Sequence, residues 1–416
     1  MTRYLTAHTQ ALEADSAAAE LEAGLGPDLA PGESLAGGLL LATAASGTLA
    51  DEVARRFVDQ WPDAHWAGAT FEGLVANGQI VRDEPALVVL AWTDGPHEPI
   101  SFLAPPGLQD AASLEAEIME LAGGRALDAD DLVLLFPDAV AAVQLDRVLG
   151  ELGAMLSPAK LAGAAAAGID GHPARVFFDG EAPEASLLGL FVPSPSLSPP
   201  QVSVEAPLDE ARTRACGRVG CAEGTRAASP WLEVTACRER WVDGLDQEPA
   251  LDWVRRQLGL DEDASIEPHL GRLLARVERR GLNGAPTKTE YEERYVVGVD
   301  NGRGAFAWPG SVSRGDLLAL ALPDAERARE ALRNVIAELP DTPIVLQFAC
   351  RARDASLHGD PDVESAWAAH HAKDAVVLGT VSPFQVVSGE DGAGRVVVHS
   401  SVLAGLGPRA EGKDFG

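Results

Sequence analysis

Cysteine is scarce in this chain of 416 residues, which carries only Cys216, Cys221, Cys237 and Cys350. So few thiols exclude the disulfide framework that stabilises small secreted domains. The spacing of the first three cysteines matches no zinc-finger pattern, and no fourth ligand is evident beside them. We therefore expect reduced structural thiols and no metal site.

Basic residues are also in deficit. The chain has 33 Lys and Arg against 63 Asp and Glu, which gives a formal net charge of −30 and a pI near 4.6. Nucleic acids and anionic membranes bind basic surfaces, so we expect neither as a partner. Only four of the basic residues are lysines, and alanine is abundant, a composition typical of a bacterium with a GC-rich genome.

Long apolar runs are missing as well. No run approaches the ~20 residues that a membrane-spanning helix needs. The N-terminus carries only Arg3 before a polar stretch and lacks the apolar core of a signal peptide. We therefore expect a cytoplasmic protein without membrane insertion.

What the sequence does contain is a repeated unit, in which an apolar strand precedes an amphipathic helix and a second strand that runs into a glycine-centred turn. The three turn glycines are Gly68, Gly163 and Gly379, and the apolar first strands lie at residues 39–43, 132–136 and 344–348. A looser copy includes a strand at 231–237 and a second helix around residues 270–280. Such long units do not fit a solenoid. The pattern predicts an α/β fold with two lobes of repeated strand–helix–strand units and mixed sheets.

The length favours two to three domains. Prolines gather at residues 193–207 among Ser and Gly, which indicates a linker or a crossing between lobes. The predicted division is an N-terminal extension, a first domain, a linker or crossing segment, a second domain and a polar tail, at residues 1–35, 36–198, 199–230, 231–405 and 406–416.

Four segments, in order along the chain, carry a resemblance to FIST-domain proteins. Residues 66–73 stand where the family has a G-C-S-T-x-G-E-like turn, and residues 245–252 resemble its D-G-x-P-A-L-D helix start. Residues 348–353 resemble its F-x-C-x-x-R strand end, and residues 379–386 stand at a G-x-x-x-x-G-E-I turn. The first domain is thus similar to the FIST N module and the second to FIST C.

The resemblance implies a sensory module that binds small ligands, with amino acids or small acidic molecules as the expected class. Members of the family often carry a kinase or cyclase output domain; we expect none attached here, and therefore signal transduction through a separate output protein. Some related proteins are haem-based nitric oxide sensors, so haem is the alternative to our expectation of no cofactor.

Cys350 and Arg353 lie where a buried strand is expected to end. Arg353 is predicted to hold a ligand carboxylate through two parallel hydrogen bonds, with Cys350 lining the pocket. The alternative is a buried Cys acting as a small apolar side chain, and an Arg paired with a local acid such as Asp354.

Two turns supply the other candidate ligand-binding residues. Thr70 and Glu72 lie in the first turn, and a carboxylate opposite Arg353 would suit the amino and carboxyl ends of an amino acid; the alternative is an exposed turn glutamate. Ser382 and Gln385 lie in the last turn, where Gln385 keeps hydrogen-bonding capacity in place of the family's glutamate.

Two further functions stay open. His172, His370 and His371 are the histidines considered as haem ligands, although neighbouring helical residues point about 100° apart and cannot form one site. An enzyme on a small amide or acid would use Cys350 as nucleophile with His358. No catalytic motif supports it, so we favour binding over catalysis.

Overall fold

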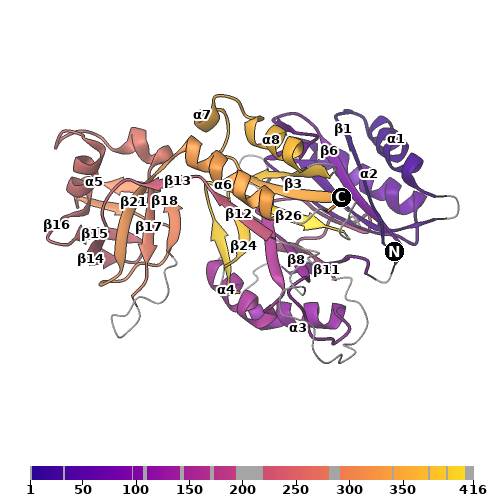
Figure 1. The fold of residues 1–416 in the computed structure, drawn as a ribbon, viewed down its shortest axis with the longest axis horizontal. Helices are drawn as coiled ribbons and strands as arrows, with labels where there is room; N and C mark the ends of the chain where they lie inside the picture. The colour runs from indigo at the N-terminus through magenta and orange to yellow at the C-terminus, as the bar shows by residue number, and fades with distance from the viewer. Residues whose placement is uncertain are drawn as a thin grey trace, which may run out of the picture. The chain divides into compact units, whose positions relative to one another are not determined.

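The computed structural model describes residues 2–30, 33–95, 97–105, 110–140, 145–168, 173–193, 219–280, 291–339, 342–372, 375–389 and 392–407. The chain divides into two compact units. Unit 1 comprises Met1–Ala222, Ala331–Val396 and Ser400–Gly416, and unit 2 comprises Glu223–Glu330 and Val397–His399. Figure 1 shows the mixture of helices and strands, which confirms the predicted α/β class with mixed sheets.

The first sheet of unit 1 has the strand order β1-β6-β2-β3-β10. Its helices α1 and α2 lie side by side over one face (Figure 1), with Leu21, Val53 and Phe57 fully buried against the strands. The strands are β1 (Tyr4–Thr9), β2 (Leu35–Thr43), β3 (His65–Phe71), β6 (Leu87–Thr93) and β10 (Val176–Phe178), and the helices are α1 (Ala14–Leu25), η1 (Gly26–Asp28), η2 (Ala44–Ser46) and α2 (Gly47–Gln60).

The second sheet has the order β25-β24-β9-β8-β11-β7. Helices α3 and α4 cover it through Leu114, Ile118 and Leu152, which are fully buried. Its elements are β7 (Ile100–Ala104), α3 (Ala111–Leu121), β8 (Leu132–Pro137), α4 (Leu145–Leu156), β9 (Lys160–Ala164), β11 (Leu187–Val192), β24 (Gln385–Ser388) and β25 (Gly394–Val397).

The third sheet has the order β12-β26-β22-β23-β4-β5. Helices α6 and α8 cover one face, where Val345, Val377 and Leu403 form the apolar core. Its elements are β4 (Gly73–Ala76), β5 (Gln79–Arg82), β12 (Val219–Glu223), α6 (Ala325–Glu338), β22 (Ile344–Cys350), α7 (Ala355–His358), α8 (Val363–His371), β23 (Val376–Ser382) and β26 (Ser400–Leu406).

The repeated unit is a parallel strand pair, and the glycines lie inside its second strand. The pairs β2–β3, β8–β9 and β22–β23 place Gly68 opposite Leu40, Gly163 opposite Leu135 and Gly379 opposite Gln347. A Cβ at any of the three glycines would overlap the carbonyl oxygen of its partner. The glycine-centred turns of the prediction are therefore wrong: glycine is used because two backbones approach closely within a strand.

The three sheets of unit 1 exchange strands in a cycle. After β3 the chain enters β4, which pairs with β23; after β23 it enters β24, which pairs with β9; after β9 it reaches β10, which pairs with β3. In each exchange the glycine is a paired position, opposite Val75, Val386 or Phe177. The first and last parts of the sequence are thus interleaved in one unit.

Unit 2 contains a fourth sheet, with the order β18-β17-β21-β14-β15-β20-β19 and with β13 and β16 paired to β21 and β15. Helix α5 packs Trp253 and Val254 into the apolar core of unit 2. Its elements are β13 (Thr225–Ala227), β14 (Leu232–Arg238), β15 (Trp241–Leu245), β16 (Glu248–Pro249), α5 (Ala250–Leu258), η3 (Glu267–Arg272), β17 (Leu274–Glu278), β18 (Glu292–Tyr295), β19 (Gly298–Asp300), β20 (Ala305–Ala307) and β21 (Leu317–Pro323).

Two segments differ from their predicted form. The helix expected around residues 270–280 is wrong: a short 3-10 helix ends at Arg272 and β17 follows, paired on both sides with β18 and β21. The apolar spacing of that segment mimics a helix because β17 is buried on both faces. Residues 1–35, expected as an extension, supply β1 and α1 to the first sheet and its core.

Candidate functional site

The predicted site residues gather where three strands of unit 1 end. Strand β3 ends at Phe71, β22 at Cys350 and β23 at Ser382. Cys350 pairs with Ser382 in the parallel ladder, and β4, which follows β3 after Glu72, pairs with β23. The carboxyl ends of parallel strands are the usual place for a ligand site in an α/β fold.

An inner polar cluster lies at this edge, formed by Cys350, Thr380, Ser382, Gln385 and Ser400, all of which are buried. Gln385 Nε2 donates to the Ser382 carbonyl oxygen at 3.3 Å, and Ser400 Oγ donates to Gln385 Oε1 at 3.1 Å. The Cys350 thiol lies 3.9 Å from the Pro383 carbonyl oxygen. The structure thus brings together three residues that the sequence predicted.

Two hydroxyls of the inner polar cluster, Thr380 Oγ1 and Ser382 Oγ, have no hydrogen-bond partner among the described residues. Thr380 is paired with Phe348, so both side chains lie on the same face of the sheet. The Phe348 ring lies 5.9 Å from that of Phe136, which in turn lies 5.6 Å from that of Phe71. The cluster therefore faces the interior where the three sheets meet.

A charged rim, formed by Glu72, Arg82, Arg351 and Asp354, lies at the same strand ends. Arg351 Nη1 donates to Glu72 Oε1 at 2.8 Å, with the two side chains 58% and 28% exposed. Arg82 Nη1 donates to the Arg351 carbonyl oxygen at 3.3 Å and lies 3.4 Å from Asp354 Oδ2. Arg82 Nε and Nη2 are buried and have no hydrogen-bond partner in the described part of the chain.

The carboxylate of Asp354 is held in its charged form. Burial by itself raises its pKa, but hydrogen bonds from Ser356 and the charge of Arg82 bring the pKa below its usual range. The charged rim therefore contains two carboxylates and two guanidinium groups, of which Arg82 has unused donors.

Arg353, the predicted ligand arginine, is fully buried and bonded within unit 1. Its Nε donates to both carboxylate oxygens of Glu364 at 2.9 Å, its Nη2 lies 2.6 Å from Glu364 Oε1, and its Nη1 donates to the Ala222 carbonyl oxygen at 2.7 Å. His358 Nε2 lies 2.8 Å from the same Glu364 oxygen. A ligand carboxylate would have to displace Glu364 to reach this guanidinium.

The Glu364 carboxyl is also kept charged. Burial alone would raise its pKa, but the charge of Arg353 and the hydrogen bonds from His358 and Arg353 hold the pKa below its usual range. Asp354, the local acid considered as the partner of Arg353, pairs with Arg82. The buried ion pair ties the end of β22 to α8 and β12.

Thr70 is buried and connects two repeats. Its hydroxyl donates to the Ala167 carbonyl oxygen at 2.7 Å and accepts from the Arg175 backbone N–H at 3.0 Å. These bonds hold the end of β3 against the segment between β9 and β10. These bonds satisfy the Thr70 hydroxyl within the protein, so a structural role that needs no ligand accounts for this residue.

The residues behind the alternative functions are dispersed. His370 and His371 are exposed on α8, and His172 lies outside the described residues, as does Cys216. Cys237 Sγ lies 3.6 Å from the Val312 carbonyl oxygen, and burial raises the pKa of its thiol. His358 Nδ1 has no hydrogen-bond partner in the described ranges, so it is not bonded to the Cys350 thiol.

Sequence reasoning missed four residues at these strand ends: Arg82, Arg351, Thr380 and Ser400. Arg351 lies inside the quoted segment 348–353, two residues before Arg353, the arginine that the motif singled out. Arg82 reaches the site because β5 pairs with β4, with Gly73 opposite Arg82. Only the fold shows that pairing.

Polar side chains gathered at strand ends of an interleaved α/β unit indicate a ligand-binding module. A family model described as the FIST N domain matches residues 38–248, just over half of the chain, so this protein belongs to the FIST family. FIST domains are small-ligand-binding domains of signal transduction. The FIST C resemblance of the second domain stays a prediction.

No curated protein matches the chain. Among the described residues, no helix has both the length and the apolar character required to cross a bilayer.

Proposed function

We propose that this FIST protein senses an amino-acid-like or small acidic ligand, and that the charged rim of Glu72, Arg82, Arg351 and Asp354 binds it. One observation carries the proposal. The half-exposed ion pair between Glu72 and Arg351 stands beside Arg82, two of whose buried nitrogens have no partner in the described residues. A buried donor without an acceptor is costly, and a ligand carboxylate would supply one.

The chemistry of the rim suits a zwitterion. An α-amino acid would place its carboxylate on Arg351 and Arg82 and its ammonium group on Glu72, so that the protein ion pair is replaced by pairs with the ligand. Arginine and carboxylate groups can pair through two parallel hydrogen bonds, which adds orientation as well as energy. In this proposal Arg351 takes the role that the sequence gave to Arg353.

The inner polar cluster would change its hydrogen bonds when a ligand binds at the charged rim. The Arg351 backbone N–H donates to the Ser382 carbonyl oxygen at 2.9 Å, and Gln385 donates to the same carbonyl. A shift of Arg351 on binding would therefore change the hydrogen bonds of Ser382 and Gln385. We propose that a separate output protein reads this change, and that the protein acts in the cytoplasm.

The test is a thermal-shift screen of the full chain with the common amino acids, their analogues lacking the amino group, and small dicarboxylates, followed by titration of the best hit. Arg351→Gln should weaken binding by about 10- to 100-fold, because a charge-assisted hydrogen bond contributes ~1.5–3 kcal/mol. Arg147→Gln is the matched control, since it removes an exposed arginine paired with Glu151 on α4.

Two results would end the proposal. In the first, no compound of the panel stabilises the protein at millimolar concentration. In the second, the affinity of the hit is the same for Arg351→Gln and for Arg147→Gln, which would place binding away from the charged rim.

A further inference from the structure

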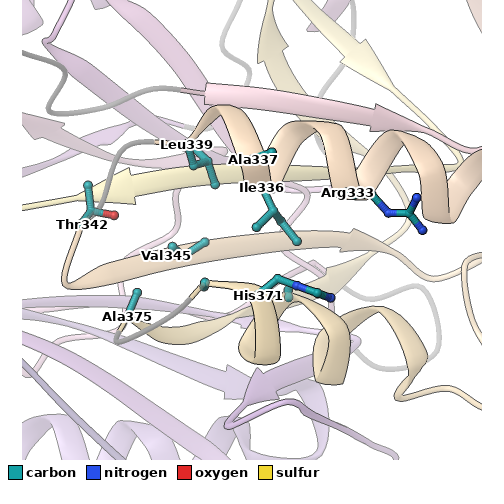
Figure 2. A pocket seen from close by; sticks show the side chains of 10 residues that line it. Arg333, Ile336, Ala337, Leu339, Thr342, Val345, His371 and Ala375 are labelled. Carbon is teal, nitrogen blue, oxygen red and sulfur yellow. The ribbon is translucent and has the colours of Figure 1, made fainter. Parts of the chain in front are cut away.

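A cavity of about 220 Å³ lies between α6 and α8, over the beginning of β22 in unit 1 (Figure 2). None of the charged-rim or inner-cluster residues lines it. Its lining consists of Arg333, Ile336, Ala337, Leu339, Thr342, Val345, Ala368, His371, Ala372 and Ala375.

The body of this α6–α8 cavity is aliphatic. Val345 of β22 and Ala368 of α8 are buried, and Ile336 and Leu339 are partly buried against the same apolar core. The hydroxyl of Thr342, at the far end, already has a hydrogen-bond acceptor, because it donates to the Ile344 carbonyl oxygen at 3.0 Å. Aliphatic walls of this kind favour a hydrocarbon chain by removing it from water.

One end of the α6–α8 cavity is cationic. Figure 2 shows Arg333 at the end opposite Thr342, with His371 on the facing helix. The Arg333 guanidinium lies 5.3 Å from the Trp367 ring centroid, and no carboxylate pairs with it in the described ranges. None of the lining residues is acidic, although the chain carries a net charge of −30. An arginine without a counter-ion beside an apolar cavity is suited to a carboxylate.

The volume limits the ligand. Pockets for drug-sized molecules hold roughly 300–1,000 Å³, so this smaller cavity fits on the order of ten non-hydrogen atoms. We propose that the α6–α8 cavity binds a short-chain aliphatic monocarboxylate, with the carboxylate on Arg333 and the chain between Ile336 and Val345. The site is distinct from the charged rim.

Calorimetric titration of the full chain with sodium hexanoate tests the proposal. Acetate is the control that keeps the carboxylate but lacks the long chain, and hexan-1-ol is the control that keeps the chain but lacks the charge. Hexanoate should bind most tightly. Arg333→Gln should weaken hexanoate by at least about tenfold, as expected for the loss of a charge-assisted contact. Arg327→Gln, on an exposed residue of the same helix that does not line the cavity, should leave the affinity within about twofold.

A second variant separates loss of the site from loss of the fold. Ala337 is exposed at the wall of the cavity, so Ala337→Phe should block hexanoate while keeping the wild-type unfolding transition. Loss of hexanoate binding in both Arg333→Gln and Ala337→Phe locates the ligand in this cavity and not at the charged rim. The proposal is overturned if hexanoate shows no saturable binding, or if its binding survives both Arg333→Gln and Ala337→Phe.

Discussion

The buried ion pair of Arg353 and Glu364 is where a single charge matters most in unit 1, because both side chains are almost fully removed from water. Glu364→Gln would leave the Arg353 guanidinium without its counter-charge. Removal of one partner from a buried pair costs about 3–5 kcal/mol. Urea denaturation should show that loss, while Glu151→Gln, which breaks an exposed pair with Arg147, should change stability by less than about 1 kcal/mol. Equal effects of the two variants would mean that the pair is not buried in solution.

The same pair predicts a pH dependence. Because the folded-state pKa of Glu364 lies below its usual range, its charged form stabilises the fold above the unfolded pKa of about 4.3, and this contribution falls as the pH drops through the folded-state value. Between pH 7 and pH 3 the wild-type protein should therefore lose more free energy of unfolding than Glu364→Gln. Parallel curves for the two proteins would show that Glu364 is not held charged by Arg353.

For individual residues, the sequence predicted where candidate residues lie along the chain better than it predicted which residues they contact. Cys350 was chosen at the expected end of a strand, and Ser382 and Gln385 were chosen in the expected last turn. The structure brings the three residues together. Which arginine faces inward was not predictable, because Glu364, the partner of Arg353, belongs to α8 and is placed only by the packing of that helix on the sheet.

Among the secondary-structure elements, the three parallel strand pairs share one requirement: the second strand has a glycine where the carbonyl oxygen of the first strand leaves no room for a Cβ. Gly379→Ala would force the backbone of β23 away from Gln347, and overpacking of this kind costs about 1–3 kcal/mol. Gly26→Ala is the control, since an added Cβ there meets nothing within 4 Å and its φ is −59°. Urea denaturation of both variants measures the difference. A Gly379→Ala protein as stable as the control would contradict the close approach.

The individual elements were largely predictable, and their connections were not. Apolar runs such as 344–348 indicated β22, and the amphipathic helix expected after the apolar run at 39–43 corresponds to α2. The repeat was evident from the sequence, but periodicity carries no information on which strand pairs with which. The exchange of β4, β10 and β24 among the sheets therefore emerged only from the structure.

At the scale of the whole molecule, the compact units cut across the order of the sequence. Unit 1 needs both ends of the chain, since β4 pairs with β23 and β9 pairs with β24. Unit 2 is almost a single segment with its own apolar core. The domain boundaries predicted from the sequence, at 36–198 and 231–405, follow the order of the motifs. The compact units of the structure follow spatial contacts and divide the chain differently.

This grouping predicts how fragments behave. A fragment of residues 223–330 should show cooperative thermal unfolding, because its core is formed within the fragment. A fragment of residues 1–222 should not, because β9 loses β24 and β4 loses β23, which exposes unpaired strand edges. Circular dichroism melts of both fragments check this. A cooperative melt of residues 1–222 alone would contradict the interleaved architecture.

The charged rim is the proposed ligand site, and one titration tests this role most directly. The affinity of the best amino acid from the screen, and of its analogue without the amino group, would be measured for the wild type and for Glu72→Gln. We expect Glu72→Gln to weaken binding of the amino acid by about tenfold or more and to leave binding of the analogue almost unchanged, because only the ammonium group contacts Glu72. Equal losses for both ligands, or none for either, would contradict this role of the charged rim.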